Sequence, residues 1–171
     1  CIGVRPGFKL VSSFFLMALR DESVGHHGAM IYADCGVVIE PSAAELAEIA
    51  IASADSCRAL IGAEPRVAML AYSTFGHPAG ERSERVQEAV KILDKRRVDF
   101  EYEGEMAADV ALNHKLMREQ YPFCRLSGPA NVLVMPALHS ASISTKMLQE
   151  LGGSTVIGPL LVGLDKPCQI V

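Results

Sequence analysis

Two runs of hydroxyl-bearing residues in this sequence have the composition of anion-binding loops. The first, Ser73-Thr74-Phe75-Gly76, follows an apolar run and offers two hydroxyls beside a flexible glycine. Hydroxyls and free backbone N–H groups at the end of a strand can together hold a phosphate or a similar anion. An ordinary strand-to-helix turn with a local hydroxyl cap has the same composition. From the pattern alone we favour the turn.

The second run ends on a cation. Residues 140–146 read SASISTK, with Lys146 last, and they follow an apolar run that predicts a buried strand. We expect this run at the start of a helix, where hydroxyls, unpaired N–H groups and an ammonium could bind a phosphate-bearing ligand. A helix cap with a solvated lysine is the competing interpretation, and the pattern supports both equally.

Other reactive side chains have weaker support. Glu105 and Asp109 are four residues apart where we expect a helix to begin. Two such carboxylates can bind a metal or serve as acid and base, but acidic residues in a first turn more often complement the helix dipole. Cys35 lies in an apolar run, which favours a buried thiol over a nucleophile. His114 and His139 have no partner at metal-ligand spacing, so the sequence predicts no metal site.

The elements that must position these residues alternate between strand and helix patterns. Ser42 and Glu45 have capping-box spacing at the start of the best-defined helix, and Gly62 stands where that helix ends. Residues 98–103 alternate apolar and acidic side chains, which predicts a strand with one wet face. The expected strands are 10–19, 30–39, 67–73, 98–103, 130–135 and 155–162, and the further expected helices are 81–95, 105–119 and 143–151.

This order of elements predicts an α/β fold. The first two strands should form an antiparallel pair within or beside a parallel sheet, so that the sheet is mixed. In open sheets of this kind, ligands bind beyond the carboxyl ends of the strands at a topological switch. We therefore expect a ligand site among the loops that follow Tyr72, Met135 and Val162.

Composition argues against several classes of protein. The chain has 16 Lys and Arg against 20 Asp and Glu, with 6% aromatic residues and no Trp, so it lacks the basic stripe and the stacking platforms of nucleic-acid binders. No apolar run reaches the ~18 residues that cross a bilayer, and no secretory signal pattern is present. The 5 Cys are widely spaced, which indicates a reducing, cytoplasmic setting.

Five long blocks carry a more specific signal. They are YADCGVVIEPSAAELAEIA, EPRVAMLAYSTFG, EYEGEMAADVAL, GPANVLVMPAL and GGSTVIGPLLVGLDKP. In this order they closely resemble the phosphate acetyl/butyryltransferase family, from about Gly7 to Pro167. The sequence is especially similar to the phosphotransacetylase portion of proteins that fuse it to an enoyl-CoA hydratase module. The same homologous domain forms the C-terminal part of large malic enzymes.

The resemblance implies a three-layer α/β/α sandwich related to isocitrate and isopropylmalate dehydrogenases, in a two-domain subunit that forms a homodimer. It implies transfer of an acetyl or butyryl group between coenzyme A and inorganic phosphate by direct attack of the CoA thiolate, with acyl-CoA and phosphate or acyl phosphate as substrates. Neither a metal nor a permanently bound cofactor is implied. Such catalysis needs proximity, a base for the thiol, and cations that hold the phosphate.

The resemblance also assigns residues. Ser73 and Thr74 match the family's Ser-Thr loop at the substrate cleft, and Lys146 matches a lysine associated with CoA binding. The resemblance therefore favours ligand binding over a turn or a helix cap for both hydroxyl runs. Thr145 stands where many members have tyrosine, and Glu150 stands where they have an arginine. A carboxylate cannot make the phosphate contact of a guanidinium.

The family's Ser-Arg motif and aspartate base follow a lysine-proline pair, which is Lys166-Pro167 here, and the sequence stops at Val171. We therefore expect residues 1–171 to be mainly the second domain of a two-domain subunit, with the catalytic residues beyond Val171. Two functions follow: an acyltransferase, and a non-catalytic acetyl-CoA-sensing domain like that of malic enzymes. A dehydrogenase module upstream would favour the sensor, and a downstream Ser-Arg motif would favour the enzyme.

Overall fold

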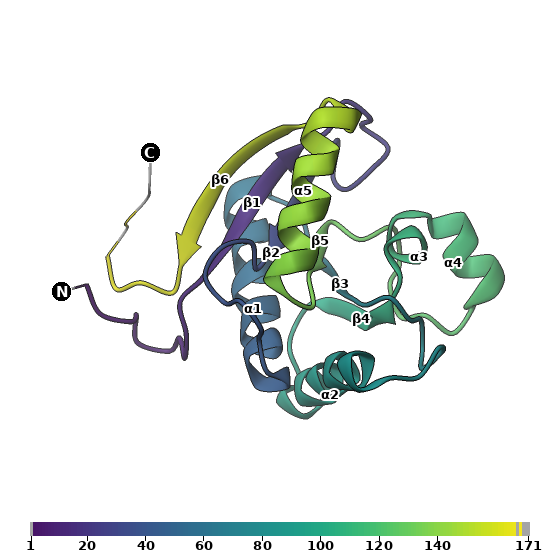
Figure 1. Cartoon of the computed structure of the whole chain (residues 1–171), viewed down its shortest axis with the longest axis horizontal. Coiled ribbons are helices and arrows are strands. Elements are labelled where there is room, and N and C mark those ends of the chain that lie inside the picture. Colours follow the sequence, from purple (N-terminus) through teal and green to yellow (C-terminus); the bar gives the residue numbers. More distant parts are fainter. Residues whose placement is uncertain (1, 167, 169–171) are drawn as a thin grey trace.

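The computed structural model describes residues 2–166 and 168, which fold around one six-stranded sheet (Figure 1). Pro167 and Val171 lie outside the described residues. The order across the sheet is β4-β3-β5-β2-β1-β6. β2 to β5 run parallel, whereas β1 runs antiparallel to both β2 and β6, so the sheet is mixed as predicted. The strands are β1 (Ser12–Ala18), β2 (Ala29–Ala33), β3 (Arg66–Leu70), β4 (Glu101–Met106), β5 (Val132–Val134) and β6 (Thr155–Val162).

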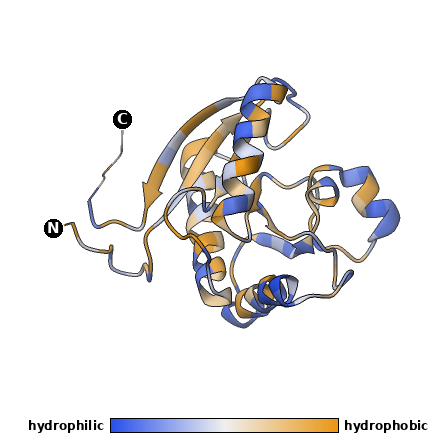
Figure 2. Ribbon diagram, in the orientation of Figure 1, coloured by the Kyte–Doolittle hydropathy of each residue, from blue (hydrophilic) through white to orange (hydrophobic). Residues whose placement is uncertain are grey.

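Helices cover both faces of the sheet, which makes the fold a three-layer α/β/α arrangement, as expected (Figure 1). One face packs against α1 (Ala43–Ser56), its π-helical extension Cys57–Ile61, and α2 (Glu81–Arg96). The other face packs against α3 (Ala108–Leu112), α4 (His114–Gln120) and α5 (Leu138–Gly152). Figure 2 shows hydrophilic residues along the outer turns of α2 and α4.

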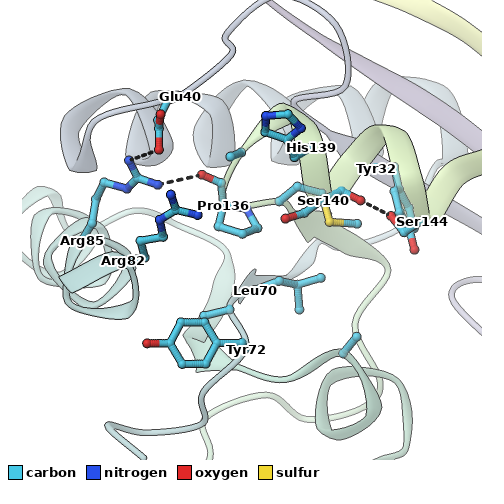
Figure 3. A pocket seen from close by; sticks show the side chains of 14 residues that line it. Tyr32, Glu40, Leu70, Tyr72, Arg82, Arg85, Pro136, His139, Ser140 and Ser144 are labelled. Atoms are coloured by element: carbon cyan, nitrogen blue, oxygen red, sulfur yellow. Dashed lines mark hydrogen bonds and ion pairs between the residues drawn. The ribbon is translucent and has the colours of Figure 1, made fainter. Parts of the chain in front are cut away.

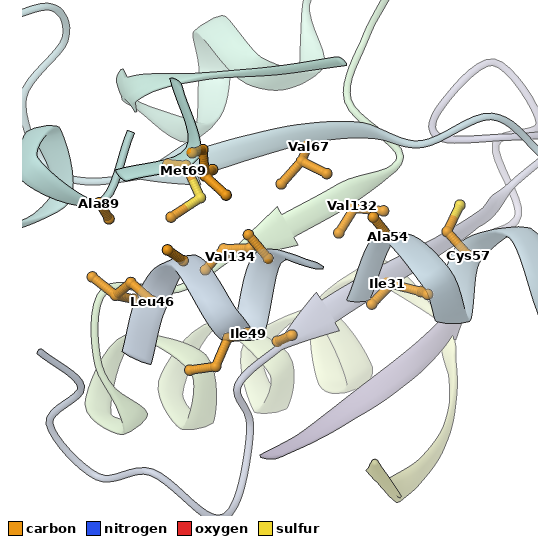
Figure 4. Packing of buried hydrophobic residues seen from close by; sticks show 14 of the residues in the cluster. Ile31, Leu46, Ile49, Ala54, Cys57, Val67, Met69, Ala89, Val132 and Val134 are labelled. Atoms are coloured by element: carbon orange, nitrogen blue, oxygen red, sulfur yellow. The ribbon is translucent and has the colours of Figure 1, made fainter. Parts of the chain in front are cut away.

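Alternation along the middle strands divides the apolar core into two clusters. Val132 and Val134 of β5 point toward α1, where they lie with Ile31 and Val67 of the neighbouring strands (Figure 4). Leu133, between them, belongs to the cluster on the other face. A parallel strand between two helical layers is apolar on both faces, which explains why residues 130–135 read as a continuous apolar run.

The best-defined predicted helix begins and ends where the sequence indicates. The Ser42 Oγ accepts a hydrogen bond from the Glu45 backbone N–H at 3.3 Å, and the Glu45 carboxylate accepts one from the Ser42 N–H at 2.8 Å. This capping box confirms the predicted start of α1. Gly62, at φ 72°, ends the π-helical extension in the left-handed conformation that favours glycine.

The strand predicted at 98–103 is confirmed only in part. It runs over Glu101–Met106, and Glu101 is exposed as expected, whereas Glu103 and the following Glu105 are only 6% and 1% exposed. Arg125 satisfies Glu103 with a two-pronged ion pair, in which Nε and Nη2 donate to the two carboxylate oxygens at 3.0 and 2.9 Å. A buried carboxylate is tolerated when it is paired and hydrogen-bonded, and such distant partners are invisible to alternation.

Two helix predictions also had wrong boundaries. The expected helix at 105–119 begins only at Ala108 and is divided into α3 and α4, so Glu105 lies on a strand and does not share a helix face with Asp109. The expected helix at 143–151 already begins at Leu138. Residues 140–146 therefore begin in the first turn of α5, as expected for a run at the start of a helix, and continue into its middle.

A buried carboxylate anchors the turn that follows β2. Asp34 is 3% exposed, and its Oδ1 accepts hydrogen bonds from the Ser13 N–H at 3.1 Å and the Ser13 hydroxyl at 2.6 Å. The backbone N–H groups of Gly36, Val37 and Val38 donate to the same carboxylate at 3.0, 3.3 and 2.8 Å. One side chain thus joins β1 to the loop that leads into α1.

Replacing Asp34 should therefore destabilise the fold. Asp34→Ala leaves buried donors without an acceptor, and we expect the free energy of unfolding to fall by about 3 kcal/mol in urea denaturation. Asp55→Ala, an exposed position on α1, is the matched control and should change stability by no more than about 0.5 kcal/mol. Equal stabilities of the two variants would contradict the anchoring role.

Alkaline pH should weaken the fold through its buried thiols. Burial raises the pKa of the Cys35 thiol to about 12 and that of Cys57 to about 11, from an ordinary 9.0. Because the folded chain holds these protons more tightly than the unfolded chain, their stabilisation is complete below pH 9.0 and is lost as the pH rises toward 11. Urea denaturation across this range should show the decline, and Cys57→Ala should flatten it. An unchanged slope in that variant would contradict the assignment.

Candidate functional site

The carboxyl ends of β3 and β5 open into a cavity of about 460 Å³ (Figure 3). The chain around Tyr72 and Met135 lines it, as expected, whereas no described residue after Val162 does. The lining residues come from β2, the end of β3, the loops at this edge, and α2, α3 and α5: Tyr32, Glu40, Leu70, Ala71, Tyr72, Arg82, Arg85, Ala108, Met135, Pro136, Ala137, His139, Ser140 and Ser144.

One wall of the cavity is cationic. Arg85 donates through Nη2 to the Pro136 carbonyl at 3.3 Å, and its Nη1 lies 3.6 Å from the Glu40 carboxylate (Figure 3). The Arg85 Nε is buried and has no hydrogen-bond partner among the described residues. Arg82, one turn away on α2, is exposed. This wall can therefore attract and hold an anion.

The opposite wall carries hydroxyl groups from β2 and α5. The Ser144 hydroxyl donates to the Ser140 carbonyl at 2.6 Å, and Tyr32 lines the same wall. Burial raises the pKa of the Tyr32 phenol, and its interaction with the Ser144 side chain opposes the shift. The Tyr32 phenol therefore stays protonated at neutral pH and can serve as a hydrogen-bond donor.

Apolar side chains form the floor between these walls. Leu70 and Met135 come from the ends of β3 and β5 and are each 5% exposed. Tyr72 closes one rim and is 59% exposed. The arrangement suits a ligand with an anionic group and a short apolar part, which the cationic wall and the floor would hold together.

The Ser-Thr loop lies beside this cavity and does not line it. Ser73 and Thr74 are 1% and 8% exposed. The Ser73 hydroxyl donates to the buried Glu105 carboxylate at 2.7 Å, and the Thr74 hydroxyl accepts from the Ala107 N–H at 3.0 Å. The Gly76 N–H also donates to the Glu105 carboxylate, at 2.8 Å.

The backbone donors of this loop are engaged as well. The N–H of Thr74 donates to the His77 carbonyl at 2.9 Å, and the N–H of Phe75 donates to the Glu105 carbonyl at 2.9 Å. Both hydroxyls therefore have internal partners across the fold, where the sequence suggested either a ligand or a local cap. Contact between this loop and a ligand stays a prediction.

Lys146 and Glu150 lie apart from the cavity, on exposed turns of α5. Ser140 and Ser144 from the same hydroxyl run do line the cavity, and they lie one turn apart on α5. Thr145 is buried, and its hydroxyl has no hydrogen-bond partner among the described residues. The structure thus divides the run between the cavity, the core and the surface.

Sequence reasoning missed the cationic wall and treated His139 as an ordinary polar residue, although it lines the cavity. Arg82 and Arg85 do carry a sequence signal: they are three residues apart at the start of a helix that follows a buried strand. Residues at that place lie at the carboxyl edge of a parallel sheet, where ligands bind. This signal is hard to recognise, because charged residues are also usual on the solvent-exposed face of a helix.

Within residues 2–166 and 168, no group of three or more His, Cys, Asp or Glu is arranged to hold a metal ion. None of the helices described there combines the length and apolar character required to cross a bilayer.

Proteins of two kinds are similar to this chain over nearly all of its length. An NADP-dependent malic enzyme of Rhizobium meliloti (strain 1021) is 66% identical over 170 residues, which are 99% of this chain and 21% of that protein. A phosphate acetyltransferase of Paracoccus denitrificans is 43% identical over 166 residues, which are 97% of this chain and 52% of that protein. The chain thus spans about half of the acetyltransferase and about a fifth of the malic enzyme.

Solved structures give the same result. The EutD phosphotransacetylase from Staphylococcus aureus superposes with a TM-score of 0.87 at 34% identity, over 98% of this chain and 50% of that chain. A phosphotransacetylase from Streptococcus pyogenes has a TM-score of 0.87 at 35% identity, over 97% of this chain and 49% of its own. Residues 1–171 match the family described as phosphate acetyl/butaryl transferase. By sequence and by fold, this chain belongs to the phosphate acetyl/butaryl transferase family.

Proposed function

We propose that the protein containing this chain transfers an acetyl or butyryl group between coenzyme A and inorganic phosphate. The family match over residues 1–171 carries the proposal. The cavity supports it, because a cationic wall suits a phosphate group and an apolar floor suits a short acyl group. In the transfer, the CoA thiolate forms a bond to the acyl carbon while the bond from that carbon to the phosphate oxygen breaks. The leaving phosphate takes the electron pair.

This chain would form one side of the substrate cleft. Lys146, exposed on α5, would contact CoA. Ser73 and Thr74 would act at the edge of the cleft, held in place by Glu105 and Ala107. The catalytic Ser-Arg motif and aspartate that the family resemblance implies would lie outside residues 1–171, and neither a metal nor a resident cofactor would take part.

The chain would form mainly the second domain of a two-domain subunit in a cytoplasmic homodimer. Its length, about half of the phosphate acetyltransferases that it matches, supports the first part. The surface of α5 supports burial against another unit, because Ile143, Met147 and Leu151 form an apolar stripe that is 60%, 55% and 81% exposed. Stripes of this kind mark contact surfaces.

A second candidate function is regulatory binding of acetyl-CoA. The observation that favours it is the 66% identity with the malic enzyme of Rhizobium meliloti, over 99% of this chain. In this case the chain would be fused to a dehydrogenase module and would bind acetyl-CoA without transferring the acyl group. The exposed carboxylate of Glu150, four residues after Lys146, is compatible with either function.

Acetyl-CoA synthesis by the 171-residue chain and by the full-length protein distinguishes these two functions. The 171-residue chain alone should not form acetyl-CoA from acetyl phosphate and CoA, because the expected catalytic groups lie outside it. The full-length protein should do so in a thioester absorbance assay. Acetyl-CoA binding without turnover, together with altered activity of a fused dehydrogenase, would instead establish the regulatory function. Turnover by the 171-residue chain would contradict the expected position of the catalytic residues.

Lys146 provides a test of the CoA contact. In the full-length protein, Lys146→Ala should weaken CoA binding by about 1 to 3 kcal/mol in calorimetry, the value of a charge-assisted hydrogen bond. Lys115→Ala on α4 is the matched control, since Lys115 is equally a surface lysine on a helix, and it should bind CoA like the wild type. An unchanged affinity in Lys146→Ala would remove this residue from the site.

A further inference from the structure

Two arginines on one face of α2 share the cavity at the carboxyl edge of the sheet. Arg82 and Arg85 are three residues apart, so their side chains lie on adjacent turns of the helix, and both line the cavity (Figure 3). Glu40 is the only carboxylate among the lining residues. Two guanidinium groups against one carboxylate leave an excess of positive charge, which an anionic ligand would neutralise.

Arg85 is held in place but keeps a hydrogen-bond donor without a partner among the described residues. Its Nη2 donates to the Pro136 carbonyl, and its Nη1 lies 3.6 Å from the Glu40 carboxylate, which is longer than a hydrogen bond. Its Nε is buried and has no partner among the described residues. A buried donor without an acceptor costs free energy, so an acceptor entering the cavity would be bound favourably.

Arg82 has more freedom. In the described ranges, 2–166 and 168, it makes neither a hydrogen bond nor an ion pair, and it is exposed. Glu81 and Glu84, its acidic neighbours on α2, do not line the cavity. The guanidinium can therefore close on a ligand beside Arg85 without first leaving a partner.

We propose that Arg82 and Arg85 together bind a phosphate dianion in this cavity, and that Glu40 competes with this anion for Arg85. The choice of phosphate over another anion rests on the proposed function. Its physical basis is the planar fork of the guanidinium, which pairs with phosphate oxygens through two parallel hydrogen bonds. The dianion has two possible sources, which are inorganic or acyl phosphate and the 3′-phosphate of CoA.

Calorimetry on the full-length protein tests the site with three probes: inorganic phosphate, CoA and 3′-dephospho-CoA. Arg82→Gln removes the charge of an exposed side chain. It should raise the Kd of the probe that occupies the site, which is inorganic phosphate or CoA, by about 10-fold or more. Glu40→Gln should lower the same Kd, because Arg85 loses its competing carboxylate. Lys95→Gln, on an exposed turn of the same helix, is the control and should bind all three probes like the wild type.

The pattern among the probes identifies the source of the phosphate. Weaker binding of inorganic phosphate by Arg82→Gln assigns the site to free or acyl phosphate. Loss of the preference for CoA over 3′-dephospho-CoA assigns it to the 3′-phosphate. Both results support the site, and opposite effects of Glu40→Gln and Arg82→Gln support the competition.

The site is overturned if Arg82→Gln and Arg85→Gln keep the wild-type affinities for all three probes while melting at the wild-type temperature. Wild-type CoA binding in such variants would leave the proposed function intact. Conversely, phosphate binding that depends on Arg82, in a full-length protein that does not bind CoA, would support the site and contradict the proposed function. A wild-type protein that binds none of the probes would overturn both.

Discussion

The middle strands of the sheet are buried on both faces, and this constraint decides where polar chemistry can lie. Residues 132–134 of β5 contact apolar clusters on alternate sides, under two layers of helices. A charged group within these strands would lose its hydration without gaining a partner. Charged and hydroxyl groups are therefore concentrated where the strands end, and the cavity forms at that edge because β3 and β5 end beside one another there.

Two buried carboxylates stabilise the edge without facing the cavity. The Asp34 carboxylate accepts hydrogen bonds from the N–H groups of the loop after β2. The Glu105 carboxylate accepts them from the Ser73 hydroxyl and the Gly76 N–H in the loop after β3. Both carboxylates therefore serve to position backbone. The charge available to a ligand comes instead from Arg82 and Arg85, on the first turns of α2, which follows the loop after β3.

Proteins named for two different activities, a phosphate acetyltransferase and a malic enzyme, are similar to this chain over nearly all of its length. One fold can host several functions, because the fold is maintained by the core and the function by the groups at the site. The side chains that bear on function are therefore surface and cavity residues, such as Lys146 on α5 and the arginines on α2. Neither group contributes to the apolar clusters.

Local signals and periodicity predicted most of the fold. The capping box at Ser42, the antiparallel opening strands and the mixed sheet follow from neighbouring residues or from apolar runs, and all are confirmed. The strand that buries Glu103 and Glu105 could not be predicted in this way, because the partners that allow burial are 22 and 32 residues distant. The arginines that line the cavity were missed for the same reason, because residues far apart in the sequence form its walls. The sequence alone determined the layers and the edge of the sheet at which the cavity lies, whereas only tertiary contacts decided which charges face the cavity and which are enclosed by the fold.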